Sequence, residues 1–162
     1  MTISTRAQQA RTSDQRPPAR SISKVSEPME HKTVLLAEDD HDLRTFIAEE
    51  LRAAGFEVVE CINGTELAEY LLRSLESDEP VALRAIVSDI RMPGATGLTA
   101  LAGLRDLGHD TPFIVMTAFG SDEVHEQAFH LGATAVFDKP FDADDLIAKV
   151  TDLTGPCSAA AL

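Results

Sequence analysis

The chain has 162 residues, of which 44% are hydrophobic and 25% are charged, and its formal net charge is −13 at pH 7. This length and composition are typical of one globular domain with short appendages, and they exclude a large multidomain enzyme. No apolar run approaches the roughly 18 residues that a membrane span needs, and no signal-peptide pattern opens the chain. We expect a cytoplasmic protein without membrane contact, and the acidic charge argues against direct binding of nucleic acid.

The charge is unevenly distributed along the chain. Residues 1–32 hold six Lys or Arg against three Asp or Glu, whereas residues 33–162 carry a net charge of −16. Residues 1–31 are rich in Ser, Arg, Gln and Pro and contain no aromatic residue, so we expect a disordered basic leader. An organelle transit peptide and translation from Met29 are the alternatives for this segment. The predicted organisation is a leader at 1–31, a domain at 32–154 and a short C-terminal tail at 155–162.

Two hydrophobic periods alternate from Thr33 onward, namely short apolar runs typical of buried strands and apolar residues at helical spacing. The predicted strands are residues 33–37, 57–61, 85–88, 113–116 and 133–137. The predicted helices follow them at about residues 43–54, 65–75, 97–107, 121–131 and 142–153. Five strand–helix units in so short a chain predict right-handed crossovers, and therefore an α/β, doubly wound, five-stranded parallel sheet with helices on both faces.

Polar side chains follow four of these strands, and sites in such sheets form at the carboxyl ends of the strands. Glu38-Asp39-Asp40 follows the first strand, Asp89 the third, Thr117 the fourth and Lys139-Pro140 the fifth. A single acid at such a place is normally solvated or a helix cap, and Asp40 is suited to cap the first helix. Converging carboxylates, however, repel one another unless protons or a cation neutralise them. An all-oxygen set of this size suits Mg²⁺.

Asp89 is then a candidate nucleophile, because a carboxylate can accept a phosphoryl group as an aspartyl-phosphate. Phosphoryl transfer depends on positioning and on neutralising the equatorial oxygens, for which Mg²⁺, the Lys139 ammonium and the Thr117 hydroxyl are suitable groups. Residues 33–162 contain one other lysine, Lys149. Simple charge balance is the alternative role for Lys139.

These residues resemble a known family, the response-regulator receiver domain of two-component signalling. The resemblance rests on Val34-Leu-Leu-Ala-Glu-Asp-Asp40, Val87-Ser-Asp-Ile-Arg-Met-Pro-Gly94 with Gly97, Met116-Thr-Ala118 and Asp138-Lys-Pro-Phe141. It implies a flavodoxin-like fold with strand order 2-1-3-4-5. It also implies a cis bond between Lys139 and Pro140.

The resemblance also implies a role for each site residue. Asp89 is expected to be the phosphoacceptor, and Glu38 and Asp39 the acidic pair that holds Mg²⁺ together with Asp89 and the backbone carbonyl of Arg91. Thr117 and Lys139 are expected to contact the phosphoryl group. The expected partners are a sensor histidine kinase or histidine phosphotransfer protein and a downstream protein target. Arg91 and Phe119 occupy positions that influence dephosphorylation in the family.

One position departs from the family pattern. Phosphorylation in the family pulls the threonine inward, and an aromatic residue on the fifth strand follows it. Here that position is Val136, and the neighbouring Phe137 is expected to face the other side of the sheet, because strand side chains alternate. We therefore expect a switch that is muted or read on another surface.

Three functions remain open from the sequence. The favoured one is a stand-alone response regulator, not an enzyme, that binds a target or relays its phosphate. A receiver-like binding module with a muted phosphorylation switch is the first alternative, favoured by Val136. A haloacid-dehalogenase-like phosphohydrolase is the second, but it needs an Asp-x-Asp motif that Glu38-Asp39-Asp40-His41 does not provide. The two Gly-rich nucleotide-binding motifs, G-x-x-x-x-G-K-[ST] and G-x-G-x-x-G, do not occur. The five histidines lack the spacing of metal ligands.

Overall fold

The computed structural model describes residues 31–78 and 81–155, so nearly all of the predicted leader and tail lies outside the described residues. The strands are β1 (Thr33–Ala37), β2 (Glu57–Cys61), β3 (Leu83–Asp89), β4 (Phe113–Thr117) and β5 (Ala135–Asp138). The helices are α1 (His41–Ala53), α2 (Gly64–Glu76), α3 (Gly97–Asp106), α4 (Asp122–His130) and α5 (Ala143–Thr154).

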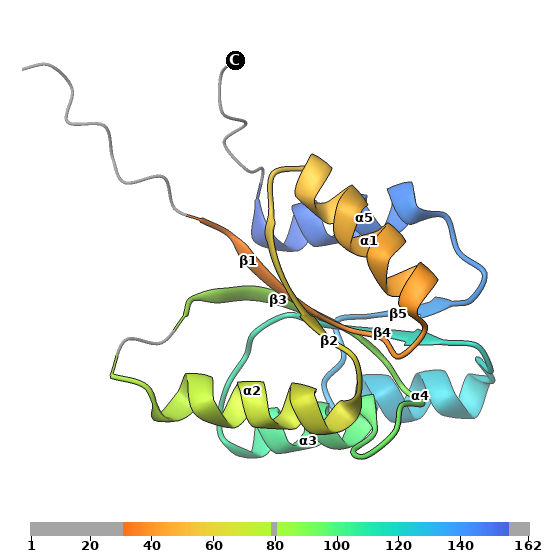
Figure 1. Cartoon of the computed structure of the whole chain (residues 1–162). Helices are drawn as coiled ribbons and strands as arrows, with labels where there is room; N and C mark the ends of the chain where they lie inside the picture. The colour runs from red at the N-terminus through yellow and green to blue at the C-terminus, as the bar shows by residue number, and fades with distance from the viewer. Residues whose placement is uncertain (1–30, 79–80, 156–162) are drawn as a thin grey trace, which may run out of the picture.

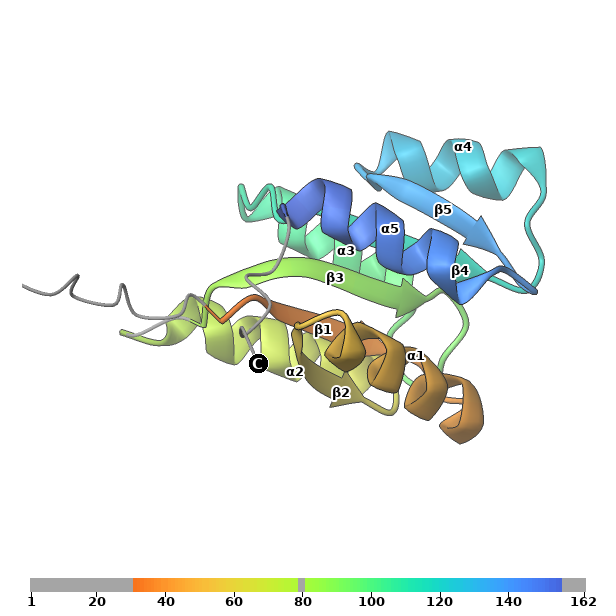
Figure 2. The same cartoon turned by 90° about the horizontal axis from the view of Figure 1, so that it is seen from above.

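The strands form one parallel sheet in the order β2-β1-β3-β4-β5. Helices α1 and α5 cover one face, and α2, α3 and α4 cover the other (Figure 1). Figure 2 looks onto the α1/α5 face and shows the two edge strands, β2 and β5, at opposite sides of the sheet. This order and layering confirm the predicted doubly wound, flavodoxin-like fold. The carboxyl ends of β1 and β3 therefore lie side by side.

Alternation along the strands divides the core into two halves. In β1, Val34 and Leu36 pack with α1 and α5, whereas Leu35 packs with α2 and α3. On β5, Val136 contacts the α2–α4 half and Phe137 contacts the α1/α5 half, where its ring meets Phe141 at 5.7 Å and 70°. The expected opposite orientation of Val136 and Phe137 is thus confirmed.

The predicted elements are all present, but the boundaries of β3, β4 and β5 differ from the prediction, that of β4 by one residue at its end. Strand β3 is longer than expected, because Leu83 pairs with Thr33 at its start and Asp89 pairs with Met116 at its end. Strand β5 starts later than expected. The N–H of Ala133 bonds to the carbonyl of Ala128 in α4, so this residue completes the helix end and not the ladder.

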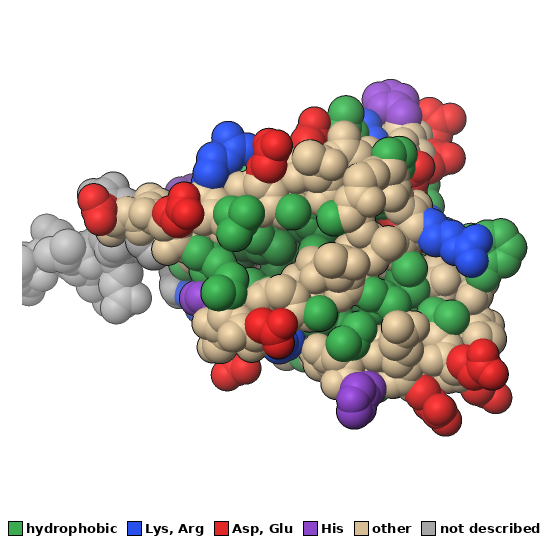
Figure 3. Space-filling view, turned by 90° about the horizontal axis from the view of Figure 1, so that it is seen from below, with side chains coloured by type: hydrophobic (Ala, Val, Ile, Leu, Met, Phe, Trp, Pro, Cys, Tyr) green, Lys and Arg blue, Asp and Glu red, His purple; other side chains and the backbone are tan. Residues whose placement is uncertain are grey.

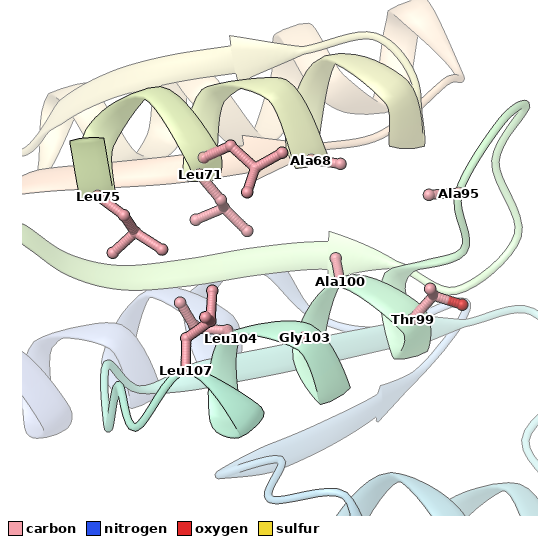
Figure 4. Close-up of a pocket in the computed structure, with 10 residues that line it drawn as sticks. Ala68, Leu71, Leu75, Ala95, Thr99, Ala100, Gly103, Leu104 and Leu107 are labelled. Carbon is pink, nitrogen blue, oxygen red and sulfur yellow. The ribbon is translucent and has the colours of Figure 1, made fainter. Parts of the chain in front are cut away.

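Among the described helices, none has the combined length and hydropathy to span a bilayer. An apolar groove of about 170 Å³ runs between α2 and α3, with Leu71, Ala100 and Leu104 among its lining residues. Figure 3 shows it as a hollow lined by hydrophobic side chains, and Figure 4 shows the leucines of the two helices facing one another across it. The groove is formed by helix packing on the α2–α4 face, and it includes none of the residues at the strand ends that the sequence singles out.

Candidate functional site

Three acidic residues meet at the carboxyl edge of the sheet. Glu38 directly follows β1 and Asp89 ends the neighbouring strand β3, and each of Glu38, Asp39 and Asp89 offers an oxygen within 4.8 Å of the others. Helix α3 begins directly against this edge, where the N–H of Gly97 bonds to the carbonyl of Ile90. A side chain at Gly97 would overlap the Asp89 carbonyl, so glycine permits this close approach.

The fourth residue of the expected set, Lys139, reaches the acids from the far side of β4. Its ammonium nitrogen lies 2.7 Å from Oε2 of Glu38 and 3.3 Å from Oδ1 of Asp89. The peptide bond between Lys139 and Pro140 is cis, as the resemblance implied. Lys139 therefore bridges the two buried carboxylates.

Thr117 ends β4, the strand between Asp89 and Lys139. The residue is buried, and its hydroxyl oxygen accepts a hydrogen bond of 3.1 Å from the N–H of Phe119. Its carbonyl accepts one of 2.8 Å from the N–H of Lys139. Thr117 thus connects the loop after β4 to the lysine at the end of β5.

Two exposed side chains flank this edge. Arg91 follows Asp89 by two residues, and its guanidinium lies 4.7 Å from the ring centroid of Phe119. This cation–π contact joins the loops that follow β3 and β4. Asp40, in contrast, is not in the acidic cluster, because its carboxylate caps α1 by accepting the N–H of Leu43 at 2.9 Å.

Burial governs the protonation of the site. It raises the pKa of Glu38, although hydrogen bonds from Lys139 and from the N–H of Asp40 oppose the rise. It also raises the pKa of Asp89, where Lys139 opposes the effect and the charge of Asp39 adds to it. Burial alone lowers the pKa of Lys139, but its contacts with Glu38 and Asp89 outweigh burial and raise it. The site thus holds carboxylates whose ionisation the fold opposes, beside a firmly protonated lysine.

The donor set fits a hard divalent cation. All the clustered ligand atoms are carboxylate oxygens, which Mg²⁺ prefers. Both oxygens of Glu38 are already engaged, one by Lys139 and one by the N–H of Asp40. The oxygens of Asp39, which is exposed, and of Asp89 are the more available ligands. A bound cation would also offset the mutual repulsion of these carboxylates.

Two features of the site are not in the set expected from the sequence. Arg44 lies buried beneath the loop that carries Glu38 and Asp39, with its Nη1 2.9 Å from the carbonyl oxygen of Glu38. His125 in α4 lies 2.8 Å from Asp138, the residue before Lys139. An arginine within the apolar stripe of the first helix was the available signal for the first feature. The sequence holds no signal for the second, since residues 125 and 138 meet through the packing of α4 on β5.

The comparisons with known proteins agree with this geometry. Residues 34–151 match the family model described as the response regulator receiver domain. The chain is similar to the transcriptional regulatory protein PrrA of Mycobacterium tuberculosis, with 34% identity over 120 residues, which are 74% of this chain and 48% of PrrA. The chain therefore spans about half the length of this curated relative.

Two solved structures are also similar. The receiver domain of the Francisella response regulator 1452 has 28% identity and a TM-score of 0.67, covering 76% of this chain and 97% of that one. A response regulator from Burkholderia pseudomallei, solved with a phosphorylated aspartic acid and a calcium ion, has 25% identity and a TM-score of 0.61, covering 74% and 66%. Because the family match runs from β1 into α5 and includes all the clustered acids and Lys139, this chain belongs to the response regulator receiver domain family.

Proposed function

We propose that this receiver domain accepts a phosphoryl group on Asp89 from a phosphohistidine of a sensor histidine kinase or a histidine phosphotransfer protein. The observation that carries the proposal is the convergence of Glu38, Asp39, Asp89 and Lys139 at one edge of the sheet. The similar Burkholderia pseudomallei protein, whose structure holds a phosphorylated aspartic acid, supports it. The result would be a changed affinity for a protein target, or transfer of the phosphoryl group to a relay protein.

The transfer requires an ionised acceptor. An oxygen of Asp89 forms a bond to phosphorus as the phosphorus–nitrogen bond of the donor breaks, and the bonding electrons leave on the imidazole nitrogen, which takes up a proton. Lys139, which already contacts Asp89, is placed to favour the ionised carboxylate and to neutralise a phosphoryl oxygen. Thr117 offers a hydroxyl at the end of β4, the strand between those that lead to Asp89 and Lys139.

A divalent cation completes the proposed chemistry. Asp39 and Asp89 would hold Mg²⁺ with the backbone carbonyl of Arg91. Glu38, whose oxygens already accept from Lys139 and from the N–H of Asp40, would contribute its negative charge. When bound, Mg²⁺ supplies neutralisation of the charge on the transferred group. Arg91 and Phe119 contact each other on the loops that follow Asp89 and Thr117, and they would affect the access of water to the phosphorylated aspartate.

The test is incubation with acetyl phosphate and Mg²⁺, with Asp89→Asn compared with the wild type. The matched control is Asp152→Asn, which removes an exposed acid on α5. We expect wild type and control to gain one phosphoryl group, labile to hydroxylamine, and Asp89→Asn to gain none. Equal labelling of Asp89→Asn, or a label that survives hydroxylamine, would contradict the proposal. Steady release of phosphate from phosphate esters would favour the phosphohydrolase.

The partners need a separate experiment. A pull-down with and without beryllofluoride, a phosphoryl mimic, should recover a protein target that prefers one form. The same target recovered equally from both forms, from a protein that is phosphorylated normally, would favour the binding module with a muted switch. The single-domain organisation and cytoplasmic location stay predictions, which the intact mass and fractionation of the native protein check.

A further inference from the structure

A buried arginine lies behind the acidic cluster without belonging to it. Arg44, on the first turn of α1, is 8% exposed. Its Nη1 donates to the backbone carbonyl of Glu38 at 2.9 Å, and its Nε donates to the carboxylate of Glu60 on β2 at 3.3 Å. Its Nη2 lies 3.1 Å from Nδ1 of His41, which must accept because a guanidinium has no acceptor. One side chain therefore joins the β1–α1 loop, the neighbouring strand and the start of the helix.

These contacts fix the backbone at Glu38 on both sides. The N–H of Glu38 donates to the carbonyl of Cys61 at the end of β2, and its own carbonyl accepts from Arg44. That carbonyl belongs to the same planar peptide unit as the nitrogen of Asp39. Holding its oxygen therefore sets the plane from which the Asp39 side chain leaves the backbone. The carboxylate of Glu38 is held separately by Lys139 and by the N–H of Asp40.

The contribution of Arg44 is geometric more than electrostatic. Its charge is paired with Glu60, and Glu60 also pairs with Arg52 at 2.8 Å. The guanidinium is a rigid, planar fork, so it can satisfy acceptors on the loop, on β2 and on His41 at the same time. A lysine keeps the charge and loses the fork. Arg44→Lys therefore separates the two contributions.

We propose that Arg44 is a positioning residue, which holds the backbone between Glu38 and Asp39 so that the Asp39 carboxylate is oriented to bind a divalent cation beside Asp89. This inference rests on the proposed function, since it assigns a residue to the metal site of that function. Arg44 itself touches neither the cation nor the phosphoryl group. Outer residues that orient metal ligands typically change metal affinity by about tenfold or more when they are replaced.

The chain provides a close control. Arg52 also lies on α1 and also pairs with Glu60, but its other contact is with the carbonyl of Val58 and not with the loop. We would compare Arg44→Lys and Arg44→Met with Arg52→Met, after circular dichroism and denaturant unfolding establish that each variant is folded. If Arg44→Met does not fold, Arg44→Lys carries the comparison.

Two binding and exchange measurements test the positioning role, and acetyl phosphate labelling is the third readout. The first is the dissociation constant of Mg²⁺ for the unphosphorylated protein by calorimetric titration, and the second is amide hydrogen exchange at Asp39 and Asp40 without metal. Both Arg44 variants should weaken Mg²⁺ binding by about tenfold and speed exchange at these two amides. Labelling by acetyl phosphate should recover at saturating Mg²⁺. Arg52→Met should resemble the wild type in all three readouts.

The outcomes distinguish a failure of the positioning role from a failure of the proposed function. A wild type that binds Mg²⁺ and Arg44 variants that bind it equally well would overturn the positioning role and leave the proposed function intact. The same weakening in Arg52→Met would also overturn it, because the effect would then come from Glu60 or from α1 as a whole. A wild type that binds no Mg²⁺ would overturn the proposed function and this inference together.

Discussion

Asp89 carries a negative charge that the fold opposes. Its side chain is nearly buried, and burial raises its pKa against the opposing effect of Lys139, with the charge of Asp39 adding to the rise. A raised pKa means that the folded protein binds this proton more tightly than the unfolded chain. The associated stability is therefore complete below the ordinary carboxyl pKa and is lost as the pH rises through the raised value. At neutral pH the ionised Asp89 destabilises the metal-free fold.

Asp89→Asn should therefore raise the free energy of unfolding of the metal-free protein at pH 7. The expected gain is on the order of 1 kcal/mol, because the substitution removes the cost of burying the charge while the lost attraction to Lys139 offsets part of that gain. The gain should shrink as the pH falls to about 4, where carboxyl groups become protonated. Urea unfolding in the presence of a chelator, with Asp152→Asn as control, measures both effects. A less stable Asp89→Asn at pH 7 would show that the pairing with Lys139 outweighs burial.

The expectation that sites form at the carboxyl ends of parallel strands predicts some residues of this site and misses others, for a physical reason. Glu38, Asp89 and Lys139 directly follow or end strands, so their meeting follows from the parallel order alone. Arg44 is different. Its burial depends on Glu60 of β2 and on the loop above it, and the sequence of α1 contains neither of these partners.

At the scale of elements, α4 is tied to β5 by one polar contact beside the site. Nε2 of His125 lies 2.8 Å from Oδ1 of Asp138, and Asp138 pairs with Thr117 in the strand register. A side chain at Gly120 would overlap the Asp138 carboxylate and crowd the His125 ring. Gly120 therefore leaves the space in which the pair forms, and α4 is linked to the strand that leads into Lys139.

Gly120→Ala should separate His125 from Asp138 while leaving both residues in the chain. We expect a loss of less than about 1 kcal/mol, because the pair is partly exposed, and faster amide exchange in the first turn of α4. In the Gly120→Ala background, Asp138→Asn should have little further effect, since the contact is already lost. Hydrogen exchange and a double-mutant cycle measure these effects.

A second glycine serves as the control for this experiment. No heavy atom lies within 4 Å of a side chain added at Gly103 in α3, and alanine favours the helix. Gly103→Ala should therefore leave α4 unchanged and slightly stabilise the protein. An unchanged exchange rate in α4 of Gly120→Ala would contradict the link between α4 and β5.

Hydrophobic periodicity predicts the elements of this fold better than it predicts their ends. The start of β1 at Thr33 follows from its apolar run, and the cap of α1 by Asp40 follows from residue chemistry. The start of β5 does not follow from the sequence of its own segment. The N–H of Ala133 donates to the carbonyl of Ala128 in α4, where the chain turns from the helix into the sheet. Such a boundary depends on a hydrogen bond between neighbouring elements, which no single segment encodes.

At the scale of the whole molecule, the sheet separates two faces that could report the state of Asp89. The resemblance implies that an aromatic residue on β5 follows the threonine and reshapes the face of α4, β5 and α5. Here Val136 occupies that position, while Phe137 faces α1 and α5 and contacts Phe141. A shallow hollow of about 430 Å³, lined by Val136 and Phe129 among others, lies on the face that would respond.

Val136→Tyr should therefore enlarge the response of α4 to beryllofluoride and Mg²⁺. The ring has the hollow beside Val136 to enter, and it would supply the aromatic group that the resemblance implies at this position of β5. We expect small amide shift changes across α4 in the wild type and larger ones in Val136→Tyr, as measured by NMR at saturating beryllofluoride. Phe137 also borders the hollow, but its ring packs with Phe141 in the α1/α5 half of the core, so Phe137→Leu is the control and should leave the α4 response small.

The wild-type result decides whether the valine matters. Substitution at Val136 changes neither the acids nor Lys139, so both proteins should bind beryllofluoride. If they bound it to different extents, the chemical shifts of the amides around Asp89 would show the difference. If the wild type displaces α4 as far as Val136→Tyr does, signal transfer needs no ring on the α4 side. The contact between His125 and Asp138 would then be one polar route from the site to α4. Repeating the titration in Gly120→Ala would test that route directly.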